Sequence, residues 1–217
     1  MKRFGQVTPP MGTTAGDAAR PDWRRVEPLE LTPILSAALD AFYEFGFHGT
    51  SVREIARRVG LTVPALYYHY ESKEGLLVAL IELSTCDVLT RAHAADNAGG
   101  NDPASRLVNV VSAIVLQMTN RARLAAVEGE SRYLSPENRG RYRAVRKGVE
   151  NLVLDIVQEG VRIGAFDAED PAETTRAILG MCQAIPRWYH AEGEVGPQAV
   201  AARYAAIATR IVGARTG

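Results

Sequence analysis

The feature that most constrains this 217-residue chain is an apolar repeat of helical period that runs from about residue 32 to the end. Apolar residues recur at i, i+3, i+4 and i+7, and no alternating β-branched runs bounded by turns interrupt them. Thr32-Pro33, Ser135-Pro136 and Asp170-Pro171 each place a capping side chain before a proline, which marks a helix start. We therefore predict an all-α fold.

Glycines mark the corresponding helix ends, because Gly46, Gly60 and Gly164 can adopt the left-handed conformation that terminates a helix. With these boundaries we expect about nine helices, near 32–46, 51–59, 63–69, 73–95, 103–120, 122–133, 136–163, 171–190 and 196–213. The pattern divides the chain into a flexible arm (1–27), a helix-turn-helix DNA-binding domain (28–72) and a larger ligand-binding and dimerisation domain (73–217).

Charge and composition exclude several classes of protein. The formal net charge is zero, and residues 29–80 hold four basic against six acidic side chains, which argues against binding of nucleic acid by bulk electrostatics. The two cysteines lack a CxxC or histidine neighbour, and no nucleotide fingerprint occurs, so we expect no metal and no cofactor. Without an apolar run of membrane length or a secretion signal, the sequence predicts a soluble, cytoplasmic protein without a membrane partner.

The arm mixes Gly, Pro, Thr and Ala with basic residues and has no helical or strand period. Two interpretations stay open for it. It is either an inert tail or a basic arm that contacts the backbone or minor groove of DNA.

Residues 51–69 have the pattern of a helix-turn-helix. Ala56 is small where two helices must approach closely, Gly60 permits the turn, and Leu61 fills the corner. Thr62 can cap the second helix, with Pro64 in its first turn. We expect the segment 62–69 to lie in the major groove of DNA.

The exposed side of that second helix would show Tyr67, Tyr68 and His69 with no Lys or Glu beside them. Such side chains, with nearby Lys73, suit phosphate oxygens, whereas Thr62, Val63 and Ala65 can approach thymine methyls and base edges. Arg53 has the length and fork to reach a guanine edge. The alternative is that the aromatic residues only cement this helix to its neighbours.

The stretch from Phe42 to Leu77 resembles the N-terminal signature of the TetR family of bacterial transcriptional regulators. The residues that carry the resemblance are Gly46-Phe47, Thr50, Ile55-Ala56, Gly60, Leu66 to Tyr70 and Ser72 to Glu74. It implies a dimer of nine or ten helices per chain that binds operator DNA. By position, it implies base contacts from Arg53, Thr62, Val63, Pro64 and Ala65, and phosphate contacts from Thr50, Ser51, Tyr67, Tyr68, His69 and Lys73.

The C-terminal part carries longer apolar faces than a single helix needs, which indicates a bundle around a ligand cavity. Polar and aromatic residues interrupt these faces, and arginines beside an apolar cavity suit a ligand with an anionic head. A filled core and surface salt bridges are the alternatives. The predicted ligand-binding residues are Val111, Ile114, Gln117, Met118, Arg146, Met181, Arg187 and Trp188.

Segments 128–153, 159–181 and 187–212, including Arg187-Trp188-Tyr189, look like the C-terminal half of TetR-type repressors that respond to acyl-CoA thioesters. We therefore expect a homodimeric repressor that binds a palindromic, double-stranded operator and is released by a small hydrophobic or acyl-CoA-like effector. Small residues in the last two helices suit close packing between subunits. An enzyme and a protein-binding helical adaptor are the alternatives. The enzyme is disfavoured because the four histidines lack a nucleophile motif.

Overall fold

The computed structural model describes residues 22–27 and 29–214, and over these ranges the chain is helical without any strand. The elements are α1 (Pro33–Gly49), α2 (Val52–Arg58), α3 (Val63–His69), α4 (Lys73–Ala98), α5 (Pro103–Asn120), α6 (Ala122–Val127), the 3₁₀ helix η1 (Glu128–Tyr133), α7 (Pro136–Arg162), α8 (Pro171–Gln183), the 3₁₀ helix η2 (Ile185–Arg187) and α9 (Pro197–Ile211). The predicted all-α class and helix number are confirmed. None of the described helices is long and apolar enough to cross a membrane.

The predicted helix starts are confirmed by hydrogen bonds. The side chains of Thr32, Ser135 and Asp170 each accept a backbone N–H of the first helical turn, and a proline follows each of them. Two of the predicted ends, at Gly60 and Gly164, lie just beyond α2 and α7. Capping is decided by neighbouring residues alone, and the sequence therefore located these boundaries well.

Three helices differ from their predicted extents. The helix expected over 122–133 divides into α6 and η1, where Gly129 and Ser131 weaken helix propensity. The helix expected over 171–190 ends at Gln183, since Pro186 cannot donate to the helical ladder and η2 follows. Helix α1 continues past Gly46 to Gly49 through a kink.

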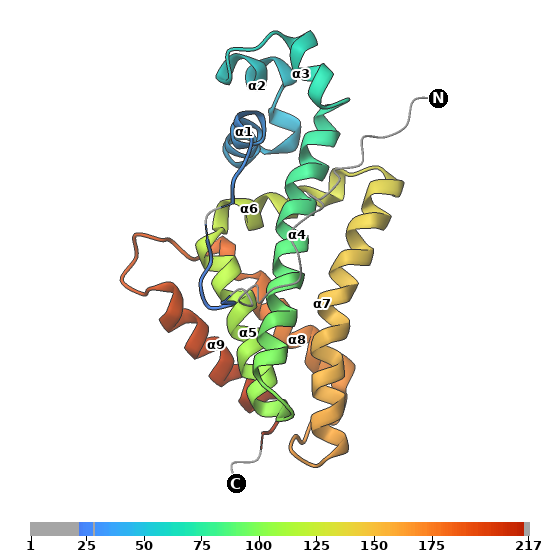
Figure 1. The fold of residues 1–217 in the computed structure, drawn as a ribbon, viewed down its shortest axis with the longest axis vertical. Coiled ribbons are helices and arrows are strands. Elements are labelled where there is room, and N and C mark those ends of the chain that lie inside the picture. Colours follow the sequence, from blue (N-terminus) through green and yellow to red (C-terminus); the bar gives the residue numbers. More distant parts are fainter. Residues whose placement is uncertain (1–21, 28, 215–217) are drawn as a thin grey trace, which may run out of the picture.

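The long helix α4 joins the two halves of the molecule (Figure 1). Its first turns share a buried core with α1, α2 and α3, to which α6 adds Leu124 and Val127. Its later turns belong to a second core built around α5 together with α7, α8 and α9. The three N-terminal helices therefore contact the rest of the chain through both α4 and α6. We call residues 73–214 the effector half, after the ligand-binding role predicted for it.

The last residues of the predicted arm pack against the effector half. Trp23 is buried in the second core, and Arg91 of α4 donates to its carbonyl at 3.3 Å and to that of Arg25 at 2.8 Å. Arg121 donates to the carbonyl of Glu27 at 2.6 Å. Residues 22–27 of the arm predicted over 1–27 are thus held against α4 and α5 and are not part of a flexible segment. Residues 1–21, on which the choice between an inert tail and a DNA-contacting arm also depends, lie outside the described residues.

Candidate DNA-binding surface and effector cavity

Helices α2 and α3 form the predicted helix-turn-helix. Ile55 and Ala56 of α2 and Leu66 of α3 are buried in one core. Between the helices, Gly60 adopts φ 67°, and the N–H of Leu61 donates to the Ala56 carbonyl at 2.9 Å. A residue with a Cβ would be strained at this φ, so the glycine supports the tight turn.

The outer face of α3 is available to a partner. Thr62 caps the helix by accepting the N–H of Ala65 at 3.3 Å. Tyr68 is 87% exposed and Tyr67 45% exposed, and the rings of Tyr68 and His69 meet edge to face at 5.4 Å. Every residue of this helix predicted to contact DNA is at least partly exposed: Thr62, Val63, Pro64, Ala65, Tyr67, Tyr68 and His69. The face carries no Lys, Arg, Asp or Glu, and it suits base edges and phosphates better than a salt-bridged surface.

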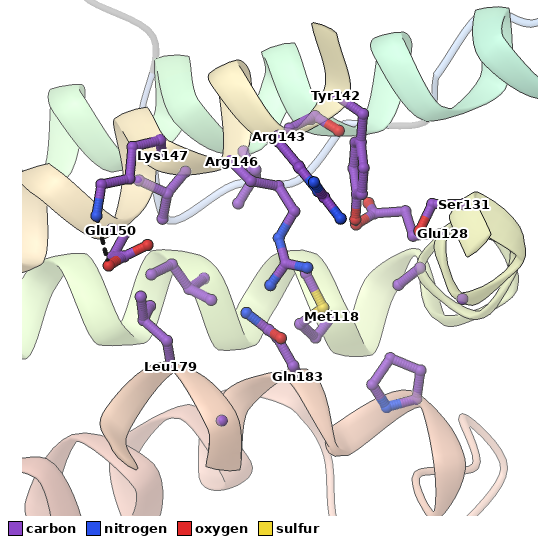
Figure 2. Close-up of a pocket in the computed structure, with 18 of the residues that line it drawn as sticks. Met118, Glu128, Ser131, Tyr142, Arg143, Arg146, Lys147, Glu150, Leu179 and Gln183 are labelled. Carbon is purple, nitrogen blue, oxygen red and sulfur yellow. Dashed lines mark hydrogen bonds and ion pairs between the residues drawn. The ribbon is translucent and has the colours of Figure 1, made fainter. Parts of the chain in front are cut away.

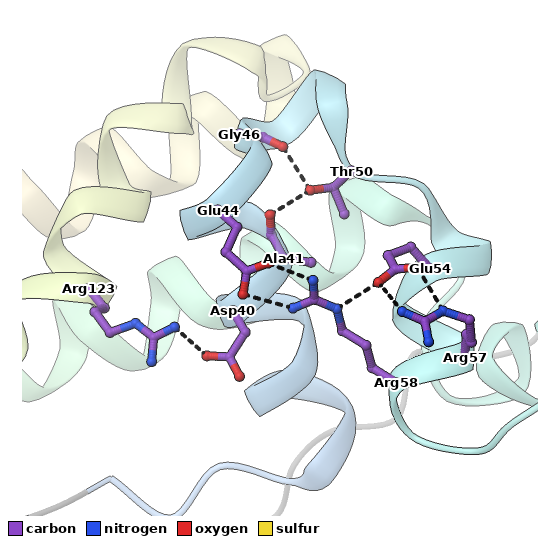
Figure 3. A network of polar contacts seen from close by, with 9 residues as sticks. All are labelled: Asp40, Ala41, Glu44, Gly46, Thr50, Glu54, Arg57, Arg58 and Arg123. Carbon is purple, nitrogen blue, oxygen red and sulfur yellow. Dashed lines mark hydrogen bonds and ion pairs between the residues drawn. The ribbon is translucent and has the colours of Figure 1, made fainter.

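The arginines of α2 are not equivalent (Figure 3). Arg57 donates to Glu54 at 2.8 and 3.0 Å, and Arg58 is held between Glu54 at 2.9 Å and Glu44 at 2.7 Å. Hydrogen bonds from both arginines lower the pKa of the Glu54 carboxyl to about 2. Arg53 is exposed and forms no ion pair with any described residue. Arg53, the arginine predicted to contact a base, is therefore the one arginine of α2 without a carboxylate partner among the described residues.

Two of the residues predicted to contact phosphates, Thr50 and Lys73, form side-chain hydrogen bonds within the protein. Thr50 is buried, and its hydroxyl, as a donor, lies 2.8 Å from the carbonyl oxygens of both Ala41 and Gly46, so its hydroxyl proton is already used within the protein. Lys73 is partly buried and donates to the carbonyls of Phe47 at 2.6 Å and Thr50 at 2.8 Å. Burial also lowers the pKa of its ammonium group. Both residues hold the end of α1 in place, a role that depends on chain folding and that spacing alone does not reveal.

Ser51 differs from its neighbour Thr50. It is exposed, and its hydroxyl accepts the N–H of Glu54 at 3.1 Å as the N-cap of α2. Its own hydroxyl proton remains available, so the predicted phosphate contact by Ser51 stays a prediction.

A cavity of about 1050 Å³, open to solvent, lies between α4, α5, α6, η1, α7 and α8 (Figure 2). Helix α7 presents Tyr142, Arg143, Arg146 and Lys147 along one side. Apolar side chains of α4, α5 and α8 also line the cavity: Val88, Ile114, Met118 and Leu179. The lining thus combines basic side chains, most of them from α7, with an apolar surface.

Half of the predicted ligand-binding residues line this cavity, namely Ile114, Met118, Arg146 and Arg187. The other four do not line it. Val111 and Gln117 lie on the same helix as Ile114 but are buried in its packed face, and Met181 packs against the same core. Trp188 is 46% exposed outside the cavity, where its ring stacks on Tyr204 at 6.3 Å.

The cations of the cavity are only partly neutralised by the protein. Lys147 pairs with Glu150 at 2.7 Å and Arg176 with Glu173. Arg143, Arg146 and Arg187 form no ion pair with any residue in the described part of the chain. Glu128 lies within electrostatic reach of Arg146, and burial raises the pKa of this carboxyl and so favours its neutral form. The cavity therefore carries an excess of positive charge that suits an anionic ligand.

Several lining residues were not among the predicted ligand-binding residues, including Glu128, Arg139, Lys147, Arg176 and Gln183. A signal for part of this set was present in the sequence. Basic residues at 139, 143, 146 and 147 recur at intervals of three and four, which puts them on one side of a helix. Such spacing also fits a helix face that is exposed to solvent. Only the packing of α7 against α5 and α8 shows that these side chains line a cavity.

Two family models match the chain. One described as "Tetracyclin repressor-like, C-terminal domain" covers residues 100–212, and one described as "Bacterial regulatory proteins, tetR family" covers residues 34–80. Among curated proteins, the chain is 25% identical over 201 residues to the HTH-type transcriptional repressor KstR2 of Rhodococcus jostii. That alignment covers 92% of this chain and 94% of the relative.

Solved structures share the whole architecture. A bacterial regulatory protein in the tetR family from Rhodococcus RHA1 superposes with a TM-score of 0.78 at 30% identity, covering 85% of this chain and 97% of that one. AibR, crystallised in complex with isovaleryl coenzyme A and operator DNA, gives a TM-score of 0.71 at 23% identity, with coverage of 84% and 97%. The second likeness shows a common fold.

Proposed function

The chain belongs to the TetR family of bacterial regulatory proteins, and from this premise we propose that it is a dimeric repressor that binds a palindromic operator and is released by an acyl-CoA thioester. The predicted resemblance to this family is confirmed, as is the prediction of a transcriptional regulator rather than an enzyme. The operator, the dimer and the effector are the parts that we propose.

The exposed face of α3 supports the proposed mode of DNA binding. Its side chains are uncharged or aromatic, and Arg53 on α2 is an exposed cation nearby that forms no ion pair with any described residue. One such surface is small, so two copies related by a two-fold axis would supply the affinity and read half-sites roughly 34 Å apart. Since few phosphates are neutralised, we expect a shallow dependence of affinity on salt.

Helices α8 and α9 are the proposed dimer contacts. On α9, Ile207 and Ile211 are each 39% exposed and lie one turn apart. An apolar strip of this kind is covered when a second copy packs against it. Val200 and Ala208 on the same helix are buried within the chain itself, so only the outer side of α9 is available for dimerisation.

The uncompensated arginines of the cavity are the observation that carries the proposed effector. An acyl-CoA thioester has phosphate groups that pair with guanidinium ions and an acyl chain that suits the wall of Ile114, Met118 and Leu179. AibR binds isovaleryl coenzyme A in a chain of the same fold, which supports this ligand class for the present cavity.

Fluorescence anisotropy tests both parts of the proposal. The labelled DNA is the region that flanks the protein's own coding sequence, or a fragment that the protein selects from random DNA. We expect saturable binding by a dimer and release by decanoyl-CoA, with a weaker effect of free CoA or decanoate. The absence of any bound DNA would contradict the repressor, and release by none of these compounds would contradict the effector class.

A further inference from the structure

The end of α1 is an irregular segment that residues from other elements hold in place. Gly46 departs from helical geometry at φ 68°, ψ 174°, within a helix that runs on to Gly49. A break of this kind leaves the next backbone N–H without its partner in the helical ladder. The Phe47 N–H instead donates to the carboxylate of Glu130 at 2.7 Å. Glu130 belongs to η1, in the effector half and 83 residues further along the chain.

A second residue of η1 holds the same segment. The ring of Tyr133 stacks on Phe47 at 5.9 Å with an interplanar angle of 14°. It also meets the ring of His48 edge to face at 4.2 Å. Lys73 contacts the same residue: its ammonium group donates to the Phe47 carbonyl, and its Nζ atom lies 4.4 Å from the centre of the Phe47 ring. Phe47 is therefore held by contacts with η1 and with Lys73, the first residue of α4.

The remaining residues of η1 face the effector cavity. Glu128, Gly129, Ser131 and Arg132 all line it, and Glu128 and Ser131 lie together at one end of the cavity beside Tyr142 (Figure 2). Glu128 accepts the hydroxyl of Ser84, which places η1 against α4 as well. A 3₁₀ helix has weaker hydrogen bonds than an α-helix and is often found at hinges. One short, deformable segment thus contacts the cavity with some residues and the N-terminal unit with others.

We propose that Glu130 and Tyr133 are positioning residues that tie the orientation of the helix-turn-helix to the occupancy of the effector cavity. The proposal rests on the proposed function and assigns its regulation to η1. A ligand that pushes on Ser131 and Glu128 displaces η1, and Glu130 and Tyr133 carry this displacement to Phe47 and so to α1 and α2. Neither positioning residue is a predicted DNA contact, so their effect on DNA affinity is indirect. Any such coupling is reciprocal, and DNA binding weakens the ligand by the same factor.

The test is a double-mutant cycle that needs no effector. Ser131→Tyr introduces bulk into the cavity from η1, and Glu130→Ala with Tyr133→Ala removes the contacts to α1. DNA affinity is measured by anisotropy with a fragment selected by the unsubstituted protein. We expect Ser131→Tyr to weaken binding by about tenfold when Glu130 and Tyr133 are present, and by less than about twofold when both are alanine.

Matched variants separate positioning from stability. Glu130→Gln keeps an acceptor for the Phe47 N–H, and Tyr133→Phe keeps the stacked ring, so this pair should restore the response to Ser131→Tyr. Circular dichroism and gel filtration establish folding and dimerisation, and the alanine variants are also made singly in case the pair fails to fold. Hydrogen exchange at the Phe47 amide should accelerate in Glu130→Ala and not in Glu130→Gln.

Two outcomes overturn the inference while leaving the repressor intact. In one, the protein binds DNA and the effects of Ser131→Tyr and the alanine substitutions simply add. In the other, the Gln and Phe variants respond to Ser131→Tyr no better than the alanine variants. If the unsubstituted protein selects no DNA at all, the proposed function fails, and this inference fails with it.

Discussion

Replacement of Gly160 by alanine should destabilise the protein, although the same change usually stabilises a helix. Gly160 lies in α7, and a Cβ built there would sit 2.1, 2.4 and 2.6 Å from three ring carbons of Phe166. Carbon atoms in contact normally stay about 3.5–4.0 Å apart, so the ring must move by more than about 1 Å. Phe166 is buried, and its N–H donates to the Gly160 carbonyl at 3.0 Å, which ties the ring's own backbone to the site of the clash.

The magnitude follows from two opposing terms. Alanine in a helix interior gains about 1 kcal/mol over glycine. Expulsion of a buried phenylalanine ring costs about 3–5 kcal/mol, by analogy with its truncation to alanine. The expected net loss is therefore about 2–4 kcal/mol. For a chain of this size that corresponds to a fall in melting temperature of roughly 5–15 °C.

Gly140 provides the control within the same helix. A Cβ at this position meets no atom within 4 Å, so Gly140→Ala should raise the melting temperature by roughly 2–4 °C. Thermal unfolding is followed by circular dichroism at one protein concentration, because dimer stability depends on it. Adding Phe166→Leu to Gly160→Ala should recover part of the loss. Equal shifts for Gly160→Ala and Gly140→Ala would refute the reasoning.

Three further predictions concern function and reactivity. Arg53→Ala should lower affinity for the selected DNA by about 10- to 100-fold. Arg57→Ala should lower it several-fold less, because the Arg57 guanidinium is already paired with Glu54, and equal losses of affinity in the anisotropy assay would contradict this. Arg146→Ala should weaken decanoyl-CoA binding in calorimetry by at least about tenfold and Arg146→Lys by less, and unchanged binding in both would exclude this cation from the site. Burial raises the pKa of Cys182 to about 12, while Cys86 is exposed, so a disulfide reagent at neutral pH should modify one thiol in the native protein and two after denaturation.

The sequence by itself determined where most helices begin and where the helix-turn-helix lies. Helix starts at Thr32, Ser135 and Asp170 were predictable because a cap and its proline act on the adjacent turn without help from the rest of the fold. The turn at Gly60 and the exposed aromatic residues of α3 were predictable for the same reason, since their conformation and spacing are local.

Only the tertiary structure decided which residues of a helix line the cavity and which charged side chains are paired. Ile114 and Gln117 lie three residues apart on α5, and the sequence alone could not tell that Ile114 lines the cavity whereas Gln117 is buried outside its lining. Likewise, Arg53 and Arg58 look alike in sequence, but Arg58 is neutralised by Glu44, 14 residues away on α1. Helical period reports which side of a helix avoids water. What lies opposite that side depends on long-range packing, which has no local signature.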